Sequence, residues 1–579
     1  MCGIVGYVGY RSAAGVCRSG LSALEYRGYD SYGIATVSPD ISIYKMTGRI
    51  SAAPADMGLG GTCGIGHTRW ATHGVPSKEN AHPFMDCNGN IAVVHNGIID
   101  NYAELKRGLE GRGHVFTSDT DTEVIPHLIE EVYTDNLLEA VAQILPLLHG
   151  SYAILVISKG KQEIVAARRG SPLVIGLGDN EFILASDVLP ILDYTRRVIY
   201  LEDGDIADVL GNKVQIYHDN VLVSRMDTLI EWDSADVRKG GFPHYMLKEM
   251  YEQPEVFART VYSVSENCSS LLPLRNASSV TVIACGTSAN ASLYFAYMVE
   301  QICGIPTRVV LASEYKYYPT PKSGVVIGVS QSGETADTIS ALKIAKENGA
   351  KTFCLTNVLG SSLTRIADTT IYTRAGPEVS VAATKSFIAQ AAAFMQIVNL
   401  ISDGKLTSAI SEIQRYLPEI LQTDVSAAVD ILKDADNLLY VGRGMSYPIV
   451  MEGALKMKEL SYIHAEGYAA GELKHGPFAL LSEDMPVVSI CLPGLTYPVM
   501  MSNIKEMSAR LSPEIIIGEA GDVDAEEAAD VFIPIPKVSE TAGVLLSSVV
   551  MQLLAYYVAD ALGKDVDMPR NLAKSVTVE

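Results

Sequence analysis

The second half of the chain repeats one pattern, in which an apolar strand ends at a glycine turn and leads into a helical segment. VTVIACGTSAN and NLLYVGRGMSY share this pattern and place Gly286 opposite Gly442. Farther along, VVIGVSQSGE and MPVVSICLPG align Ser330 with Cys491. Alternating strands and helices are typical of parallel sheets covered on both faces. We therefore predict two copies of one doubly wound α/β unit, although apolar strands that end in glycine recur in any α/β protein.

The first two hundred or so residues have a different character. They are rich in glycine and short strands such as IAVVHNGII and YAILVIS, separated by helical patterns such as SDTDTEVIPHLIEEVY. The polar stretch EWDSADVRKGGF then predicts a linker. The expected parts are an N-terminal domain over 2–225, a linker over 226–243, α/β units over 244–424 and 425–568, and a tail over 569–579.

Composition excludes several classes of protein. A chain of 579 residues is too long for one hydrophobic core, and 48% hydrophobic with 19% charged residues indicates packed globular domains. The net charge of -22 argues against nucleic acid and anionic membrane surfaces as partners. GVLLSSVVMQLLAYYVADAL is interrupted by polar residues, so we expect a buried helix rather than a membrane span.

The cysteines and the N-terminus indicate a cytoplasmic setting. Nine cysteines without a CxxC pair indicate neither a disulfide framework nor a zinc site, so we expect no metal and no cofactor. The N-terminus lacks the basic segment and apolar run of a signal peptide. A reducing compartment fits both observations.

Hydroxyl side chains follow the strands of the first α/β unit, directly before helical segments. They are Thr287, Ser288, Ser330, Ser332 and Thr335. Hydroxyls and free N–H groups at helix N-termini bind anions. SQSGETADT lacks the spacing and the lysine of a Walker loop, so a sugar phosphate is a better ligand than a nucleoside triphosphate. Helix capping would explain one or two of these hydroxyls, but not five.

Cys2 is the candidate nucleophile of the N-terminal domain. If Met1 is removed, Cys2 carries both a thiol and an α-amino group that titrates near about 7.7–8.0, low enough to accept the thiol proton. The thiolate is the species that attacks a carbonyl. A cysteine at position 2 does not by itself indicate a nucleophile, so that role depends on the other motifs of the domain.

Those motifs provide the groups that an amide-cleaving thiolate needs. Asn96 and Gly97 in VHNGII could donate hydrogen bonds to a developing oxyanion. Arg69 and Asp121 could hold the α-carboxylate and α-ammonium of an amino acid. Of the nearby histidines, His73 stays a candidate.

For His67 and His82 we prefer ordinary hydrogen-bonded roles.

One helix face of the second α/β unit carries several charges. The face is formed by Glu452, Lys456 and Glu459, at i, i+4 and i+7. Such a face is usually a solvated salt-bridge stripe, and the alternative is a cluster of acids and a base over a substrate.

These motifs together resemble a known family. MCGIVGY, EYRGYDS, GHTRWATHG, HNGII and TDTE resemble the class II glutamine amidotransferase domain, an N-terminal-nucleophile fold with αββα layers. ACGTS, SQSGETADT, EGALKMKE, GELKHGP and PRNLAKSVTVE resemble paired sugar isomerase (SIS) domains with parallel sheets. In this order, and over nearly the whole chain, they resemble the glutamine:fructose-6-phosphate aminotransferase family.

The resemblance implies a role for each motif residue. Cys2 would be the nucleophile, with Asn96 and Gly97 as oxyanion hole. The glutamine-binding residues would be Arg69, Trp70, Thr72, His73 and Asp121, with Trp70 gating an ammonia path. The sugar-phosphate residues would be Thr287, Ser288, Ser330, Gln331, Ser332, Thr335 and Glu452.

The resemblance also implies the chemistry of the sugar site. Lys574 would form a Schiff base with the sugar, and Glu459 would move a proton between C1 and C2 with support from Lys456. His475 would assist ring opening from a neighbouring subunit, which implies a homodimer. Ammonia from glutamine would reach fructose 6-phosphate through a protected passage, because water would protonate it. The product would be glucosamine 6-phosphate, the first intermediate of amino sugar synthesis.

Some features depart from the family or favour rivals. Tyr32 and Ala383 replace smaller and hydroxylated residues, and 202–241 is short. The pyrophosphate loops of amidophosphoribosyltransferases and asparagine synthetases, and the iron-sulfur spacings of glutamate synthase, are absent from the sequence. A sugar-phosphate sensor would carry a basic DNA-binding face, whereas a deglycase or aminosugar deaminase running the reverse reaction is the nearer alternative.

Overall fold

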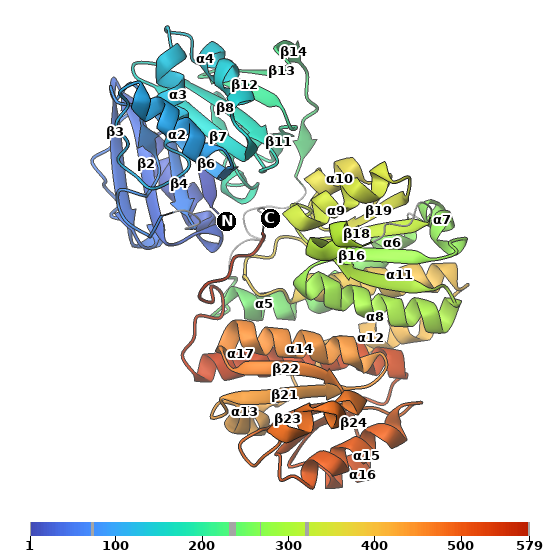
Figure 1. Cartoon of the computed structure of the whole chain (residues 1–579). Helices are drawn as coiled ribbons and strands as arrows, with labels where there is room; N and C mark the ends of the chain where they lie inside the picture. The colour runs from blue at the N-terminus through green and yellow to red at the C-terminus, as the bar shows by residue number, and fades with distance from the viewer. Residues whose placement is uncertain (1, 71–73, 231–238, 267, 319–323, 577–579) are drawn as a thin grey trace. The chain divides into compact units, whose positions relative to one another are not determined.

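The computed structural model describes residues 2–70, 74–230, 239–266, 268–318 and 324–576. The chain divides into two compact units, Met1–Val237 with Ser575–Glu579 and Arg238–Lys574. Each unit has its own sheets and core, and each is described by itself (Figure 1).

Unit 1 contains two antiparallel sheets between layers of helices. The first sheet has the order β15-β11-β9-β10-β1-β4-β2-β3 and the second β14-β13-β12-β8-β7-β6-β5. The strands of the first are β1 (Gly3–Val8), β2 (Ser31–Ser38), β3 (Asp40–Thr47), β4 (Cys63–Arg69), β9 (Val174–Leu177), β10 (Phe182–Ala185), β11 (Arg197–Tyr200) and β15 (Thr228–Leu229). Those of the second are β5 (Phe84–Met85), β6 (Ile91–Ile99), β7 (Gly150–Ser158), β8 (Glu163–Arg169), β12 (Asp205–Leu210), β13 (Lys213–His218) and β14 (Val221–Val223).

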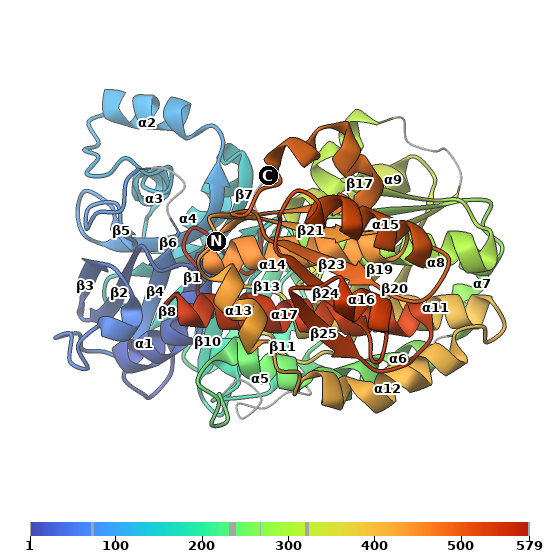
Figure 2. The same ribbon diagram turned by 90° about the horizontal axis from the view of Figure 1, so that it is seen from below.

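The helices of unit 1 lie outside the two sheets. They are α1 (Ala13–Ala23), α2 (Tyr102–Gly111), α3 (Val124–Val132) and α4 (Leu137–Ile144). Helix α1 packs on the first sheet, whereas α3 and α4 pack on the second. Figure 2 shows α1 and α2 on opposite sides of the strands. These αββα layers are the ones that the resemblance implied.

The alternation of side chains along β6 explains why both of its faces are buried. Ala92 and Val94 join the core between the two sheets, whereas Ile91 and Val93 join the core under α3 and α4. Successive side chains of a strand point to opposite faces, so Asn96 continues the row that faces the first sheet. The pleat therefore directs Asn96 toward the sheet that begins with β1.

Unit 2 contains two parallel five-stranded sheets with the same strand order. The first is β17-β16-β18-β19-β20 and the second β22-β21-β23-β24-β25. Their strands are β16 (Val280–Ala284), β17 (Thr307–Leu311), β18 (Val325–Val329), β19 (Lys351–Thr356), β20 (Thr369–Tyr372), β21 (Asn437–Gly442), β22 (His464–Ala469), β23 (Val487–Cys491), β24 (Glu514–Glu519) and β25 (Val531–Ile535). Along the chain, the first strand of each copy leads to a glycine: Gly286 follows β16, and Gly442 ends β21. The third strand of each copy leads to the other matched pair: Ser330 follows β18, and Cys491 ends β23. The predicted repeat is confirmed.

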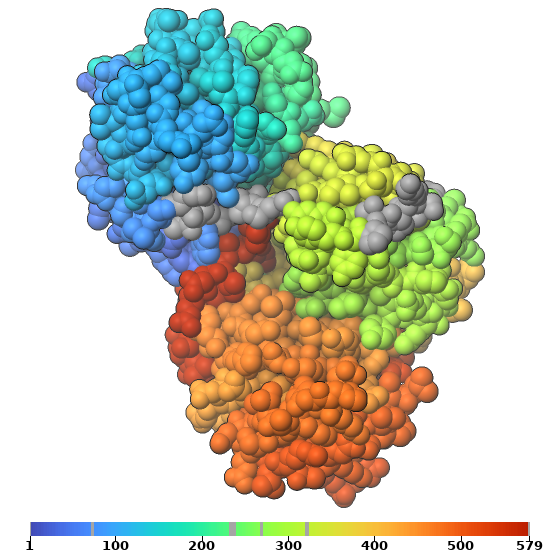
Figure 3. Space-filling view, viewed as in Figure 1, coloured from blue at the N-terminus to red at the C-terminus, as the bar shows by residue number. Residues whose placement is uncertain are grey.

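One continuous apolar core joins the two copies. It contains side chains of α8, α11, α14 and α17, which lie between the two sheets (Figure 1). The helices of unit 2 are α5 (Tyr245–Tyr251), α6 (Gln253–Glu266), α7 (Leu272–Arg275), α8 (Gly286–Cys303), α9 (Ala336–Glu347), α10 (Ser362–Ile366), α11 (Lys385–Ile401), α12 (Thr407–Ile420), α13 (Ser426–Leu432), α14 (Ser446–Ser461), α15 (Tyr497–Ser508), α16 (Val523–Glu527) and α17 (Glu540–Ala561). Figure 3 shows the two copies, green to yellow and orange, in close contact.

Helix α17 is long and apolar enough to cross a bilayer, and it is the only such helix among the described residues. Of its most apolar window, 94% is buried inside the protein. It packs against α14 and α12 in the shared core, so the expected buried helix is confirmed.

Candidate functional site

Cys2 lies where three segments of unit 1 meet. It directly precedes β1, which pairs with β4 in the register Gly3↔Thr68. The Trp70 N–H just after β4 donates to Cys2 Sγ at 3.2 Å. Asn96 Nδ2 on β6 donates to the Cys2 carbonyl oxygen at 2.9 Å. The structure thus brings Cys2, Trp70 and Asn96 together from positions far apart in the sequence.

Gly97 occupies a position that only glycine fits. Its φ is +132°, a conformation that side chains rarely adopt, and an added Cβ would lie 2.0 Å from the Ser151 carbonyl oxygen on β7. The backbone beside Asn96 therefore adopts this unusual conformation while β6 stays paired with β7.

Arg69 and Asp121 are buried on the same side of unit 1 as Cys2. Arg69 donates to the carbonyl oxygens of Gly74 at 3.0 Å and Val75 at 3.4 Å, and Asp121 Oδ2 accepts from the Ile99 N–H at 2.8 Å. Burial raises the pKa of the Cys2 thiol, the Trp70 N–H and the charge of Arg69 act to lower it, and the charge of Asp121 acts to raise it. Both charges are thus close enough to act on the thiol.

A buried group of histidines lies behind this site. His67 Nε2 and the His95 carbonyl oxygen are 3.0 Å apart, and Thr122 Oγ1 hydrogen-bonds His82 at 3.0 Å and His95 at 2.8 Å. Burial lowers the pKa of all three histidines, that of His67 to about 3. The hydrogen-bonded roles preferred for His67 and His82 are confirmed. Thr72 and His73 lie outside the described residues.

The hydroxyl residues predicted to bind phosphate gather in the turn between β18 and α9. Ser330 Oγ shares a hydrogen bond of 2.8 Å with Thr335 Oγ1 and accepts from the Gly333 N–H at 3.0 Å. Ser332 Oγ accepts from the Glu334 N–H at 3.2 Å. Gly333 has a φ of +66°, which tightens the turn. The side chains of Ser330, Ser332 and Thr335 therefore converge at the N-terminus of α9.

Thr287 and Ser288 begin α8 at the end of the neighbouring strand β16. Because β16 and β18 are adjacent and parallel, both turns lie at the same edge of the sheet. Ser288 Oγ accepts from Gln390 Nε2 at 3.0 Å. Gln331 follows β18, and its carbonyl oxygen accepts from the Asn357 N–H at 3.0 Å. The connection after β16 leads to β17 on one side, and the connection after β18 leads to β19 on the other. Open α/β sheets bind ligands at such a point, where neighbouring connections run in opposite directions.

On the face of α14 that carries Glu452, Lys456 and Glu459, the first two residues are buried and Glu459 is partly exposed. Glu452 is 2% and Lys456 1% exposed, because α14 packs against α8. Lys456 Nζ contacts Glu459, lies 3.5 Å from Glu452 and donates to Thr287 Oγ1 at 3.1 Å. The solvated stripe that this spacing usually indicates is therefore wrong for Glu452 and Lys456.

Two copies of the repeat thus contribute to one cluster. Glu452 accepts hydrogen bonds from Thr287 at 2.9 Å and Asn290 at 2.8 Å, both on α8. Burial acts to lower the pKa of Lys456, but the charges of Glu459 and Glu452 outweigh it, and the pKa is raised. The lysine therefore stays an ammonium that neutralises the two carboxylates.

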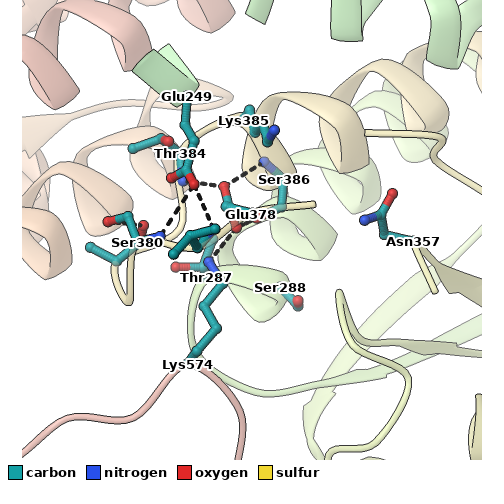
Figure 4. Close-up of polar contacts among 12 residues, drawn as sticks. Glu249, Thr287, Ser288, Asn357, Glu378, Ser380, Thr384, Lys385, Ser386 and Lys574 are labelled. Atoms are coloured by element: carbon teal, nitrogen blue, oxygen red, sulfur yellow. Dashed lines mark hydrogen bonds and ion pairs between the residues drawn. The ribbon is translucent and has the colours of Figure 1, made fainter. Parts of the chain in front are cut away.

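Lys574 forms an ion pair with Glu378, a residue that no sequence motif marked (Figure 4). Glu378 also accepts from the N–H groups of Thr384 and Ser386, both at 3.0 Å. Burial acts to raise the pKa of Glu378, but the ammonium of Lys574 and the hydrogen bonds lower it below its usual range. Figure 4 shows Lys574 directed toward Glu378 beside Thr287.

Glu249 is a second buried carboxylate that sequence reasoning missed. Its Oε1 accepts from the N–H groups of Val379 and Ser380. Burial and the charge of Glu378 raise its pKa, so its neutral form is favoured beside the charged pair. No signal distinguished it, because it lies on the short helix α5 next to other acidic residues.

The sequence also singled out His475, Tyr32 and Ala383. His475 is exposed at the end of a 3-10 turn (Ala470–His475), and among the described residues no hydrogen bond or ion pair joins it to the Lys574 cluster. Tyr32 is buried on β2, where its ring stacks on Tyr44 with centroids 6.3 Å apart. Ala383 is half-buried in the loop that carries Glu378.

Comparisons with known proteins agree with this division of the chain. Residues 67–193 match the family described as glutamine amidotransferase domain, and residues 273–400 and 431–560 match the SIS domain family. The chain is 45% identical over 604 residues to the glutamine–fructose-6-phosphate aminotransferase (isomerizing) of Thermus thermophilus, and the match covers 100% of both chains. The chain belongs to the glutamine–fructose-6-phosphate aminotransferase family.

Other members of the glutamine–fructose-6-phosphate aminotransferase family match equally fully. The enzyme of Aquifex aeolicus is 44% identical over 594 residues, with 100% of both chains covered. A solved C-terminal domain of the glucosamine-fructose-6-phosphate aminotransferase from Francisella tularensis is 34% identical, with a TM-score of 0.52, and covers 57% of this chain and 100% of its own. The predicted fold, a glutaminase domain followed by two sugar isomerase domains, is confirmed.

Proposed function

We propose that this chain transfers the amide nitrogen of glutamine to fructose 6-phosphate and isomerises the product, which gives glucosamine 6-phosphate and glutamate. The observation that carries this function is the presence of two complementary sites in one chain. In unit 1 the thiol of Cys2 lies beside the amide of Asn96. In unit 2 Lys574 is paired with the buried carboxylate of Glu378, and hydroxyl side chains converge at the edge of the first parallel sheet.

Glutamine is cleaved by Cys2. Once Met1 is removed, the α-amino group of Cys2 accepts the thiol proton, and the thiolate attacks the side-chain amide carbon. The C–N bond breaks, the proton passes from the α-ammonium to the leaving ammonia, and water then hydrolyses the glutamyl thioester to glutamate and the free thiol. Asn96 Nδ2 and the Gly97 N–H stabilise the oxyanion, while Arg69 and Asp121 hold the α-carboxylate and α-ammonium. The support is the meeting of Cys2 with Asn96 and the electrostatic effect of both charged residues on its thiol.

The phosphate of the sugar binds at the N-terminus of α9. Ser330, Ser332 and Thr335 donate hydroxyl hydrogen bonds, and the helix N-terminus adds backbone N–H groups and a favourable dipole. Thr287, Ser288 and Gln331 complete the edge of the sheet. The converging hydroxyls support this assignment.

Lys574 attacks the C2 carbonyl of the open sugar and forms an imine with loss of water. The attacking amine must be neutral, so a proton must leave Lys574 first, and Glu378, which contacts Nζ, is the carboxylate placed to accept it. Ammonia then displaces the lysine from C2. Glu459 moves the proton between C1 and C2, and Lys456 keeps that carboxylate in place.

We further propose a homodimer in which His475 of each subunit assists ring opening in the other. The support is the exposure of His475 and its separation from the contacts around Lys574. Light scattering on the purified chain would give twice the mass of 62.3 kDa, and a monomer that makes aminosugar would contradict the proposal. The cytoplasmic location and the absence of nucleic acid and membrane partners stay predictions.

Isotope labelling tests the whole reaction. The chain receives amide-¹⁵N glutamine, fructose 6-phosphate and unlabelled ammonium together, and mass spectrometry follows the aminosugar. We expect label in glucosamine 6-phosphate, and only unlabelled product from Cys2→Ala. Unlabelled product from the native chain would refute transfer between the sites, and glutamine hydrolysis without any aminosugar would refute the proposed acceptor. A deaminase running in reverse would show no increase of glutamine hydrolysis by fructose 6-phosphate.

A further inference from the structure

Four potential metal ligands meet on the helix-covered side of unit 1, away from the residues assigned to glutamine. Cys87 lies in the turn between β5 and β6, His114 follows α2, and His127 and Glu130 lie on α3. One ligand atom from each residue lies within 4.8 Å of the others. Three separate segments of the chain therefore converge on one point.

The distances between these atoms fit a tetrahedral ion. Cys87 Sγ lies 3.7 Å from His114 Nδ1 and 3.6 Å from His127 Nδ1. The two Nδ1 atoms are 3.3 Å apart, and Glu130 Oε2 lies 3.2 Å from His114 Nδ1 and 3.4 Å from His127 Nδ1. A tetrahedron with zinc bond lengths gives about 3.6 Å for sulfur to nitrogen and about 3.3 Å between nitrogen or oxygen atoms.

The outer nitrogens of both histidines lie near carboxylates. His114 Nε2 lies 3.4 Å from Glu131 Oε1. His127 Nε2 lies 3.9 Å from Glu123 Oε1, too far for a hydrogen bond, and has no hydrogen-bond partner among the described residues. Metal-bound histidines commonly donate their other N–H to a carboxylate, which fixes the tautomer that leaves Nδ1 free to bind. His127 is 1% exposed, so its ring has a fixed place in the core of the domain.

We propose that Cys87, His114, His127 and Glu130 bind one Zn²⁺ ion. Sulfur and imidazole ligands together favour zinc over magnesium or calcium. The thiolate and the carboxylate balance the charge of the ion, and the thiol proton is released to water on binding. Four protein ligands leave no open position, so the site is structural rather than catalytic.

The sequence did not indicate this site because its ligands are not neighbours. The expectation of no zinc site rested on the missing CxxC pair, whereas here a turn, a loop and a helix each supply part of the set. Only His127 and Glu130, at i and i+3, share a local spacing. We therefore revise the expectation of no metal.

The ion would fix the segment between α2 and α3 to the β5–β6 turn. That segment carries Asp121, and the turn leads into the strand of Asn96 and Gly97. Given the glutamine site proposed above, metal loss would raise the KM for glutamine. It would leave aminosugar formation from free ammonia unchanged, because that reaction depends on unit 2.

Metal content tests the site directly. The full chain, purified without a metal-binding tag, is analysed by elemental mass spectrometry after dialysis. We expect stoichiometric zinc in the native chain and loss of that zinc in Cys87→Ser and in His127→Gln. The matched controls are Cys303→Ser on α8 and His149→Gln, an exposed histidine of the same domain, and both should keep zinc.

Two further measurements keep the proposal testable if a ligand variant unfolds. Glu131→Gln, which leaves all four ligands in place, should weaken zinc binding by about 10- to 100-fold. Cobalt substituted for zinc should show a thiolate-to-metal absorption band that is lost in Cys87→Ser. The proposal is refuted if the native chain neither contains zinc nor binds added zinc or cobalt more tightly than Cys87→Ser does.

Discussion

Lys574 Nζ and the carboxylate of Glu378 form a buried ion pair, although the two residues are 196 positions apart in the sequence. The lysine side chain is 6% exposed and the glutamate side chain 0%. The N–H groups of Thr384 and Ser386 hold the carboxylate in place, and the carboxylate in turn holds the lysine amine. The tail of the chain is thereby attached to the first copy of the repeat.

Lys574→Arg should keep the ion pair and abolish imine formation. Arginine keeps its charge under all ordinary conditions and cannot act as the attacking amine. After incubation with fructose 6-phosphate and borohydride, the native chain should gain the mass of a reduced sugar on the peptide that contains Lys574. In the control variant Lys564→Arg, just after α17, Lys574 should still gain the mass of the reduced sugar. Labelling of Lys574→Arg at another lysine would contradict the assigned role.

Gly97→Ala should impair the glutaminase selectively. The new Cβ would lie 2.0 Å from the Ser151 carbonyl oxygen, and its φ of +132° is strained for alanine by about 1–3 kcal/mol. A displaced backbone at the oxyanion site should lower kcat/KM for glutamine about 10²-fold. Gly111→Ala, where nothing lies within 4 Å, is the matched control. Equal losses in ammonia-dependent synthesis would indicate general unfolding instead.

Lys456→Met should destabilise unit 2 strongly. It leaves the carboxylates of Glu452 and Glu459 without their buried cation, a loss that typically costs about 3–5 kcal/mol. The double variant Glu452→Gln/Lys456→Met should recover part of that loss, because it removes a buried charge. Lys458→Met, exposed on the same helix, should change the unfolding midpoint little. Equal midpoints for Lys456→Met and Lys458→Met would contradict this account.

Glu514→Gln should stabilise the chain more at high pH than at low pH. Burial and the charge of Asp530 raise the pKa of Glu514 from 4.5 to about 9. Between these values the folded state holds a proton that the unfolded state releases, so the native stability falls as the pH rises. The advantage of glutamine should grow by up to about 1.4 kcal/mol per pH unit in that window. Denaturant midpoints at pH 5 and pH 8 measure it, with exposed Glu527→Gln as a control that should show no trend.

The elements of unit 2 could be predicted because each carries a local signal. Ser330 follows an apolar strand and precedes a helix, and in a parallel sheet that order alone places it at the edge where the carboxyl ends of the strands meet. Helix α17 showed a long apolar pattern, which the shared core explains. Strand ends and helix starts are local features, so the positions of these hydroxyl residues could be predicted together with the elements.

Other parts of the site depend on contacts that no local pattern contains. The spacing of Glu452 and Lys456 placed them on one face of α14, but only the packing of α8 against that face decides that it is buried. Glu378 lies in an irregular loop, and its partner is at the far end of the chain. Cys87 meets its histidines only because α2 and α3 fold over the second sheet.

The hydrogen bond from Thr287 to Glu452 joins the two copies of the repeat inside their common core. Its consequence is that the two copies cannot be separated as independent domains. A fragment that ended before α14 would expose the apolar side chains of α8 and α11 and would leave Thr287 and Asn290 without the carboxylate that they contact. The repeat is therefore visible in the strand order, but the folding unit is the pair.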